Sequence, residues 1–189
     1  MKQGAFTFVL HTHLPYCRQA GQWPHGEEWL HEAASESYIP LLCALDALRA
    51  EGCPFKLTIS ITPILAEQLA DDLVRDHLTA FLEDKLRRAQ ADARRFRQEG
   101  DSHREAVARL YSDHYTSVLN SYTTTYQTDI LGALARLQDE GYLEIATSAA
   151  THGYLPLLSR DSSIAGQVQV GVRACRRHFG QAPRSFWLP

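Results

Sequence analysis

The stretch GYLEIATSAATHGYLPLL, residues 141–158, decides the fold class of this chain. Its segment YLEIATS at 142–148 combines apolar and β-branched residues over a length that is short for a helix, which predicts a buried β-strand. Small residues and His152 follow directly after it. Helical patterns lie on both sides, and a strand placed between helices is typical of an α/β fold with parallel pairing.

Three further strands are predicted on either side of this one, at 5–11, at 55–61 and at the very end of the chain in SFWLP. Helical patterns separate them, at 27–50, 64–99, 102–139 and 163–179. We expect Pro40 to kink or divide the first of these helices because it lacks a backbone N–H. The sequence therefore predicts about four parallel strands with long helical insertions.

The length limits which barrel this can be. A closed eight-fold α/β barrel typically needs about 250 residues, and the 189 residues here supply only about four strands. We therefore expect a single domain over 1–189 that forms the front part of a larger barrel, with no second domain.

Composition excludes several classes of protein. The chain carries 19 basic and 22 acidic residues, whereas proteins that bind nucleic acid backbones usually have a basic excess. No stretch approaches the ~20 apolar residues of a transmembrane helix. The four cysteines are scattered without a paired motif, which favours reduced thiols and a cytoplasmic location. Neither nucleic acid nor a membrane is a predicted partner.

Histidines mark two of the predicted strand ends. His11 and His13 are two positions apart, so on a strand they share one face. His152 follows the strand at 142–148, and the carboxyl ends of parallel strands meet at one edge of the sheet. We expect the three imidazoles to converge there. They could bind sugar hydroxyls or a metal ion, although histidines of this kind are often only bonded locally.

Aromatic residues near the first predicted loop favour a carbohydrate ligand. Tyr16, Trp23 and Trp29 lie in or beside the stretch from 13 to 26, and flat aromatic faces stack on sugar rings. Core packing is the alternative for Trp29, which lies on a predicted helix. The sequence contains no G-x-G-x-x-G, no P-loop and no G-x-S-x-G, so nucleotide-binding and serine-hydrolase sites lack support.

Three motifs resemble those of glycoside hydrolase family 57. They are His11–Tyr16 (HTHLPY), the stretch 141–158, and Phe186–Pro189 (FWLP). The second motif is most similar to the version found in the 1,4-α-glucan branching enzymes of that family. The stretches 26–42 and 176–180 resemble the same group, so the resemblance covers the whole chain.

The resemblance implies a (β/α)7 barrel that acts on α-1,4-glucans by a retaining mechanism. Retention uses a nucleophilic carboxylate and an acid/base group about 5 Å apart. In the family the nucleophile is the Glu that follows the Trp-Leu-Pro of the third motif, and the acid/base Asp belongs to a later one. Because Pro189 is the last residue here, we expect the N-terminal part of a catalytic domain, truncated just before the nucleophile and inactive alone.

The resemblance also implies the site residues. His11, His13 and His152 would bind the sugar at the cleavage point and help to orient the nucleophile, and Trp29 would be a subsite aromatic. The mechanism requires no cofactor and no metal ion. The implied partner is an α-1,4-glucan such as amylose or a glycogen-like chain.

Alternative functions remain open from sequence. A 4-α-glucanotransferase or an α-amylase of the same family would differ only in the acceptor that attacks the glycosyl-enzyme. A zinc-dependent polysaccharide deacetylase could use the three histidines as ligands, but such enzymes usually add an Asp near them, which neither strand end supplies. A non-catalytic glucan-binding module is the remaining alternative.

Overall fold

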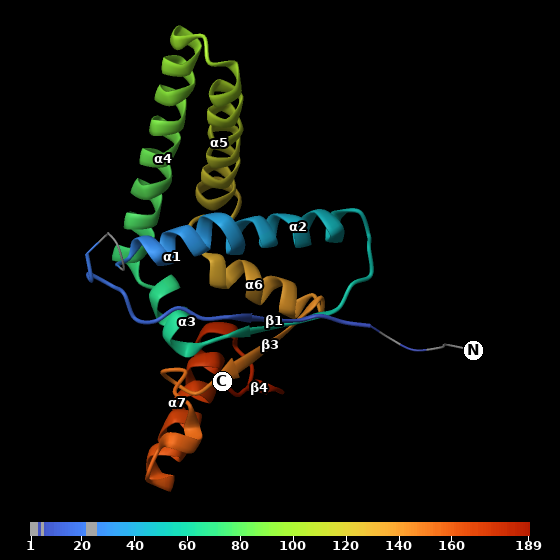
Figure 1. Ribbon diagram of the computed structural model, residues 1–189. Helices are drawn as coiled ribbons and strands as arrows, with labels where there is room; N and C mark the ends of the chain where they lie inside the picture. Colours follow the sequence, from blue (N-terminus) through green and yellow to red (C-terminus); the bar gives the residue numbers. More distant parts are fainter. Residues whose placement is uncertain (1–3, 5, 22–25) are drawn as a thin grey trace.

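Four parallel strands form the centre of the molecule (Figure 1). The computed structural model describes residues 4, 6–21 and 26–189. The strands pair in chain order, and they are β1 (Val9–Thr12), β2 (Leu57–Ile61), β3 (Leu143–Ser148) and β4 (Phe186–Trp187). All four predicted strands are present. The first begins later than predicted.

The two faces of the sheet differ in polarity because side chains alternate along each strand. Ile59, Ile61 and Ile145 belong to the buried core, which lies between the sheet and the helices. The opposite face carries His11, Ser60 and Ala146, which are register partners across β1, β2 and β3. The histidine of β1 therefore stands on the face that the core helices do not cover.

Contacts between the first and the last strand show that the sheet is strongly curled. The rings of His11 on β1 and Trp187 on β4 stack with centroids 4.4 Å apart and planes 11° apart. In a flat sheet the outer two of four strands would lie about 14 Å apart, three spacings of roughly 4.8 Å. The prediction of an incomplete parallel α/β barrel is therefore confirmed.

The helical part of the connection from β1 to β2 contains a widened turn. It consists of α1 (Glu28–Ala33), the π-helical turn η1 (Ala34–Tyr38) and α2 (Ile39–Ala50). Pro40 is the second residue of α2, and Ile39 separates it from η1. The wider turn leaves room for the proline ring that would otherwise clash with the preceding turn. The predicted kink at Pro40 thus takes the form of a π-helical turn just before it.

The connection from β2 to β3 is broken twice where unbroken helices are predicted. Asp71 and Asp129 begin new helices because their carboxylates accept hydrogen bonds from the backbone N–H of Val74 and Gly132. The prediction of one helix over 64–99 is therefore wrong, as is that of one helix over 102–139. The elements are α3 (Pro63–Leu69), α4 (Asp72–Glu99), α5 (Ser102–Asn120), the π-helical turn η2 (Ser121–Thr125) and α6 (Ile130–Asp139).

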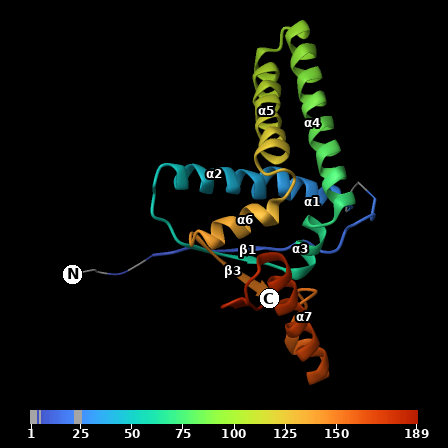
Figure 2. The same cartoon turned by 180° about the vertical axis from the view of Figure 1, so that it is seen from behind.

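Helices α4 and α5 form an antiparallel hairpin that projects from the rest of the molecule (Figures 1 and 2). Its charged side chains largely pair within the hairpin, as in the ion pairs of Arg88 with Asp84 and Arg97 with Glu105. The charged stretch over residues 83–99 is therefore a solvated helix face. Among the described residues, no helix is both long enough and apolar enough to cross a membrane.

The connection from β3 to β4 contains the short 3-10 turn η3 (Leu155–Leu157) and the helix α7 (Asp161–Phe179). Helix α7 starts two residues earlier than predicted and ends at Gly180, which adopts a left-handed conformation with φ of 69°. It packs against β3 and α3. This helix therefore supports the strand whose end carries His152.

Candidate active site

His11 and His13 point to the same side of β1, as their spacing predicts. The Nδ1 atom of His11 lies 3.1 Å from the hydroxyl of Ser60 on β2. The Nδ1 atom of His13 lies 3.1 Å from the hydroxyl of Thr62, just after β2. Both hydroxyl residues are fully buried. Each imidazole is therefore held by a hydroxyl group on the neighbouring strand or directly after it.

His152 reaches the same place from the turn after β3. Its φ of 57° is left-handed, which is uncommon for a residue with a side chain and often marks a functional site. Its backbone N–H donates to the carbonyl of Ala149, and its Nδ1 lies 3.4 Å from the hydroxyl of Ser148. The turn thus directs the third imidazole toward β1.

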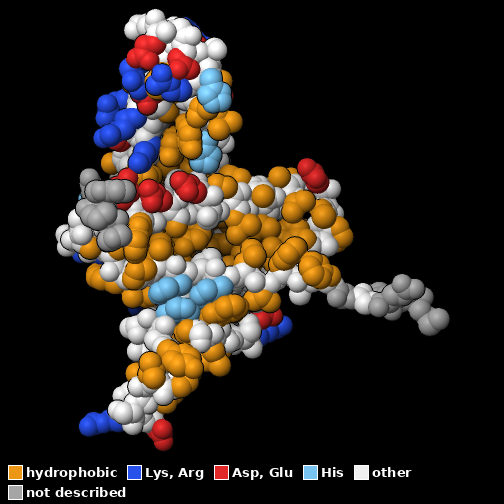
Figure 3. Space-filling model, in the orientation of Figure 1, with side chains coloured by type: hydrophobic (Ala, Val, Ile, Leu, Met, Phe, Trp, Pro, Cys, Tyr) orange, Lys and Arg blue, Asp and Glu red, His pale blue; other side chains and the backbone are white. Residues whose placement is uncertain are grey.

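The rings form a row in which His11 stacks between Trp187 and His152, while His13 lies tilted against the other face of His152. The ring of His152 lies 4.8 Å from that of His11 and 4.2 Å from that of His13, measured between centroids. Figure 3 shows histidine side chains gathered in the middle of one face of the molecule. We call His11, His13, His152 and Trp187 the histidine cluster.

The surroundings of the histidine cluster favour uncharged imidazoles. Burial, followed by the repulsion of His152 and then His11, lowers the pKa of His13 to about 4. Burial and His152 also lower the pKa of His11, and burial lowers that of His152. At neutral pH the cluster therefore presents neutral rings, which can both donate and accept hydrogen bonds.

Acidification from pH 6.5 to about 4 is expected to destabilise the protein in part through His13. In that window the unfolded chain binds a proton at this position, whose ordinary pKa is 6.5, while the folded chain does not. The stability that depends on an uncharged His13 is fully present above pH 6.5. It is lost as the pH falls through the pKa of His13 in the folded protein. The thermal midpoint, measured from pH 7.5 to 4, should fall less steeply in His13→Asn than in the wild type.

The exposed His103 on α5 supplies the matched control for this pH dependence. His103→Asn should keep the wild-type slope. An unchanged slope in His13→Asn would contradict the assignment of a depressed pKa to that imidazole.

The hydroxyl partners leave the Nε2 atoms of the cluster to a ligand. The hydroxyl of Ser148 donates to the carbonyl of Ala149, 3.1 Å away, so it accepts from the Nδ1–H of His152. That leaves Nε2 of His152 as a hydrogen-bond acceptor. A neutral acceptor beside two more imidazoles and an indole face suits the hydroxyl groups and apolar face of a sugar.

The stacked geometry does not suit a metal ion. Within residues 4, 6–21 and 26–189, no group of three His, Cys, Asp or Glu side chains is arranged to hold one. The imidazole planes of His11 and His152 are only 26° apart, so the rings lie face to face and their nitrogens do not converge on one point. This arrangement does not supply the three zinc ligands that the deacetylase alternative requires.

Two of the three predicted aromatic residues, Tyr16 and Trp29, belong to the part of the chain that the structure describes. Trp29 lies on α1 and is 41% exposed, so core packing is not its role. Among the ring contacts between described residues, none links Trp29 to the three imidazoles. Trp23 lies outside the described residues, and Tyr16 is 61% exposed in the loop after β1. Trp29 as a subsite aromatic stays a prediction.

Sequence reasoning missed four contributors to the site. The sequence marks Trp187 only as part of the FWLP motif, and it gives no strong signal for the hydroxyl partners Ser60, Thr62 and Ser148. The alternation in TISIT at 58–62 places its hydroxyls on the face opposite to the isoleucines, which is the only available signal. Serine and threonine are ordinary in strands, so that signal is weak.

A glycine lets α7 approach the end of β3 closely. A Cβ atom at Gly171 would overlap the backbone carbonyl of Ser148. The hydroxyl of Thr147 also donates to the carbonyl of Gly171, at 3.2 Å. Helix α7 thus supports the residue whose hydroxyl holds His152.

Substitution Gly171→Ala is expected to destabilise the protein by about 1–3 kcal/mol, because the added methyl group must push α7 away from β3. Urea unfolding measures the change. Gly166 on the same helix is the matched control, since a Cβ there meets no atom within 4 Å. Gly166→Ala should be neutral or stabilising by up to about 1 kcal/mol. Equal stabilities of the two variants would contradict the proposed close packing.

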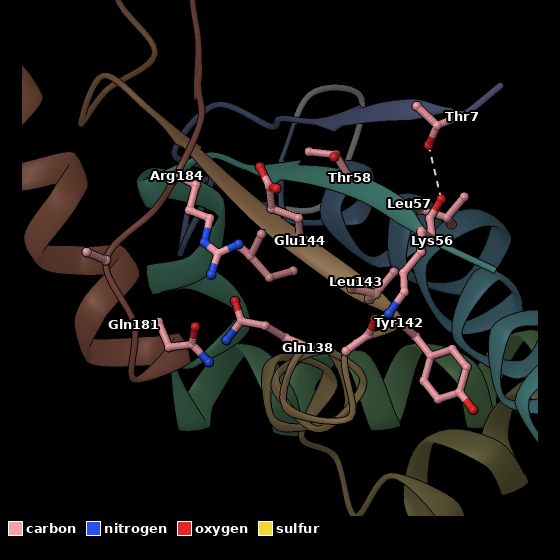
Figure 4. Close-up of a pocket in the computed structure, with 13 residues that line it drawn as sticks. Thr7, Lys56, Leu57, Thr58, Gln138, Tyr142, Leu143, Glu144, Gln181 and Arg184 are labelled. Carbon is pink, nitrogen blue, oxygen red and sulfur yellow. Dashed lines mark hydrogen bonds between the residues drawn. The ribbon is translucent and has the colours of Figure 1, made fainter. Parts of the chain in front are cut away.

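A hollow of about 400 Å³ lies at the amino ends of the strands, whereas the histidine cluster lies at their carboxyl ends. Figure 4 shows it between Lys56, Glu144 and Arg184. The carboxylate of Glu144 accepts a hydrogen bond of 2.6 Å from the hydroxyl of Ser185. In α/β barrels chemistry occurs at the carboxyl ends of the strands. This hollow lies at the amino ends of β2 and β3, so we assign the site to the histidine cluster.

Comparison with known proteins shows which family this chain is similar to. The profile of Glycosyl hydrolase family 57 matches residues 7–189. A 1,4-alpha-glucan branching enzyme of Thermococcus kodakarensis is 46% identical over 187 residues, which are 99% of this chain and 27% of that protein. The crystal structure of a branching enzyme from Pyrococcus horikoshii superposes with a TM-score of 0.92 at 47% identity, covering 97% of this chain and 34% of that one.

An α-amylase of Thermotoga maritima is also similar, with a TM-score of 0.86 and 33% identity over 96% of this chain and 35% of that one. The chain thus spans about a quarter to a third of the length of these proteins. Its curled four-stranded sheet corresponds to part of their (β/α)7 barrel. With the family profile matched over nearly all of its length, the chain belongs to glycosyl hydrolase family 57.

Proposed function

We propose that this chain is the N-terminal part of the catalytic domain of a retaining enzyme that transfers α-1,4-glucan chains to form α-1,6 branches. We call that longer protein the parent protein. The observation that carries the proposal is the convergence of His11, His13 and His152 at the carboxyl ends of the strands. The high identity to two branching enzymes favours branching over the other reactions of the family.

The histidine cluster binds the glucose unit at the cleavage point in this proposal. Neutral Nε2 atoms bond to sugar hydroxyls, and the face of Trp187 covers an apolar face of the ring. No charge from these rings opposes the positive charge that develops at the anomeric carbon. Their hydroxyl partners keep the imidazoles oriented before substrate binds, which lowers the entropic cost of reaching the reactive geometry.

The reaction needs two carboxyl groups from outside this chain. A nucleophilic Glu attacks the anomeric carbon while an Asp protonates the departing glycosidic oxygen, which leaves a covalent glycosyl-enzyme. The same Asp, now ionised, takes the proton from a sugar 6-hydroxyl as that oxygen displaces the Glu. The family motif places this Glu directly after FWLP. It would then follow the strand that carries Trp187, next to His11.

The remaining parts of the proposal concern the cellular role. A glucan-branching activity places the parent protein in glycogen biosynthesis. The scattered cysteines, all four of which are free thiols, favour the cytoplasm. The mechanism itself uses neither a metal ion nor an organic cofactor.

Product analysis on the parent protein tests this proposal. Amylose treated with the enzyme should show a lower iodine absorbance and release new short chains when a debranching enzyme is added. An increase in reducing ends without debranchable products would instead identify an α-amylase, which the similarity to the Thermotoga maritima protein makes the second candidate. Redistributed linear chains would identify a 4-α-glucanotransferase, and an unchanged glucan would identify a binding module.

A further inference from the structure

A second group of aromatic side chains lies where α5 passes the π-helical turn η1. It lines a hollow of about 560 Å³ with Glu36, Leu110, Tyr111, His114 and Tyr115, which we call the tyrosine face. Figure 3 shows hydrophobic and histidine side chains over α5 on the same side of the molecule as the histidine cluster. The tyrosine face is therefore a candidate site that the proposed chemistry does not use.

The two tyrosine rings form a platform that is anchored on one side and open on the other. Tyr111 and Tyr115 are one helical turn apart, with ring centroids 6.2 Å apart and planes within 23° of each other. Tyr115 packs partly against the hydrophobic core, and burial raises the pKa of its hydroxyl. Tyr111 is 49% exposed. A ligand could thus contact two similarly tilted rings without any rearrangement of the helix.

The charges near the rings select against an anionic ligand. Glu36 is exposed at the edge of the hollow, and none of the ion pairs between described residues includes it. Lys85, whose charge acts on Tyr115, is held by Glu28 through an ion pair of 2.9 Å. Among the described residues, the hollow therefore offers the unpaired carboxylate of Glu36, and the charge of the nearby Lys85 is already paired.

We propose that the tyrosine face is an auxiliary binding site for an α-1,4-glucan chain, separate from the histidine cluster. Aromatic rings cover the apolar faces of successive sugar units, while Glu36, His114 and the tyrosine hydroxyls bond to sugar hydroxyls. An apolar helix docked here would bury Glu36 and His114 without partners, which is costly. The choice of glucan as the ligand rests on the proposed function.

Native gel electrophoresis of the parent protein through gels that contain amylose tests the site. Tyr111→Ala should weaken the affinity for amylose about threefold to tenfold, the equivalent of one aromatic contact. The transfer rate from a short maltooligosaccharide, which fills only the histidine cluster, should not change. Tyr111→Trp should restore the affinity. Phe96→Ala, an aromatic change at the tip of the same hairpin, is the matched control and should have no effect.

An unchanged amylose affinity in Tyr111→Ala would overturn the proposal. If the thermal midpoint of that variant also falls, another part of the parent protein covers this surface. Failure of the branching reaction is a separate outcome. A parent protein that forms no α-1,6 branches but loses amylose affinity in Tyr111→Ala would contradict the proposed function and support the tyrosine face.

Discussion

Replacement of His13 by alanine is expected to lower the glucan-transfer rate of the parent protein by about 100-fold, the loss that follows when a bound substrate is displaced from its reactive geometry. The ring of His13 lies tilted against that of His152, with centroids 4.2 Å apart, and is held by Thr62, so its removal leaves the other rings free to shift. Because the sugar must be held correctly in the transition state, kcat should fall more than KM rises. Steady-state branching assays on soluble amylose measure both constants.

The exposed His103 again supplies the control, since it lies on the hairpin and outside the cluster. His103→Ala should retain wild-type kcat and KM. The variants Thr62→Ser and Thr62→Val separate positioning from packing. Serine keeps the hydroxyl and should retain most of the rate, whereas valine keeps the shape and should reduce it. Wild-type kinetics in His13→Ala would contradict the assignment of the histidine cluster to the active site.

The purified 189-residue chain is expected to form no α-1,6 branches, a loss of about a millionfold or more relative to the parent protein. Removal of the groups that make and break the covalent intermediate typically costs this much. In the proposed function, hydrogen bonds from His11, His13 and His152 would orient a sugar but would supply neither a nucleophile nor an acid. Incubation with amylose, followed by debranching and chain-length analysis, measures the activity.

A control must show that the purified chain is folded when it is tested. A cooperative thermal transition would show that the chain is folded. A lower free energy of unfolding in Gly171→Ala would show that β3 and α7 are packed as in the structure. Adding the segment that carries the two proposed carboxylates should restore branching. Branch formation by the 189-residue chain alone would contradict the proposed division of labour between this part and the remainder of the parent protein.

The sequence predicted the strands well and the helix breaks poorly. Residues 55–61 and 142–148 are short stretches rich in apolar and β-branched residues between helical patterns, and both strands lie within two residues of the prediction. The breaks at Asp71 and Asp129 contain no glycine or proline. They depend on a carboxylate that caps the next helix, and a polar residue on a helix surface gives the same pattern in sequence.

The convergence of His11, His13 and His152 followed from strand spacing alone, because parallel strands bring their carboxyl ends to one edge. The contact between His11 and Trp187 could not be predicted in the same way. It depends on how strongly four strands curl, which is set by the packing of all the helices behind them. The depressed pKa values have the same origin, since they depend mainly on burial.

The pairing of the strands in chain order has a consequence for biosynthesis. As the chain leaves the ribosome, each new strand can add to the edge of one already completed, so no earlier pairing has to open to admit it. Domains generally fold during synthesis from the N-terminal side. The contact between His11 on β1 and Trp187 on β4 would form late among the contacts of these four strands, and its formation would show that this part of the sheet has curled.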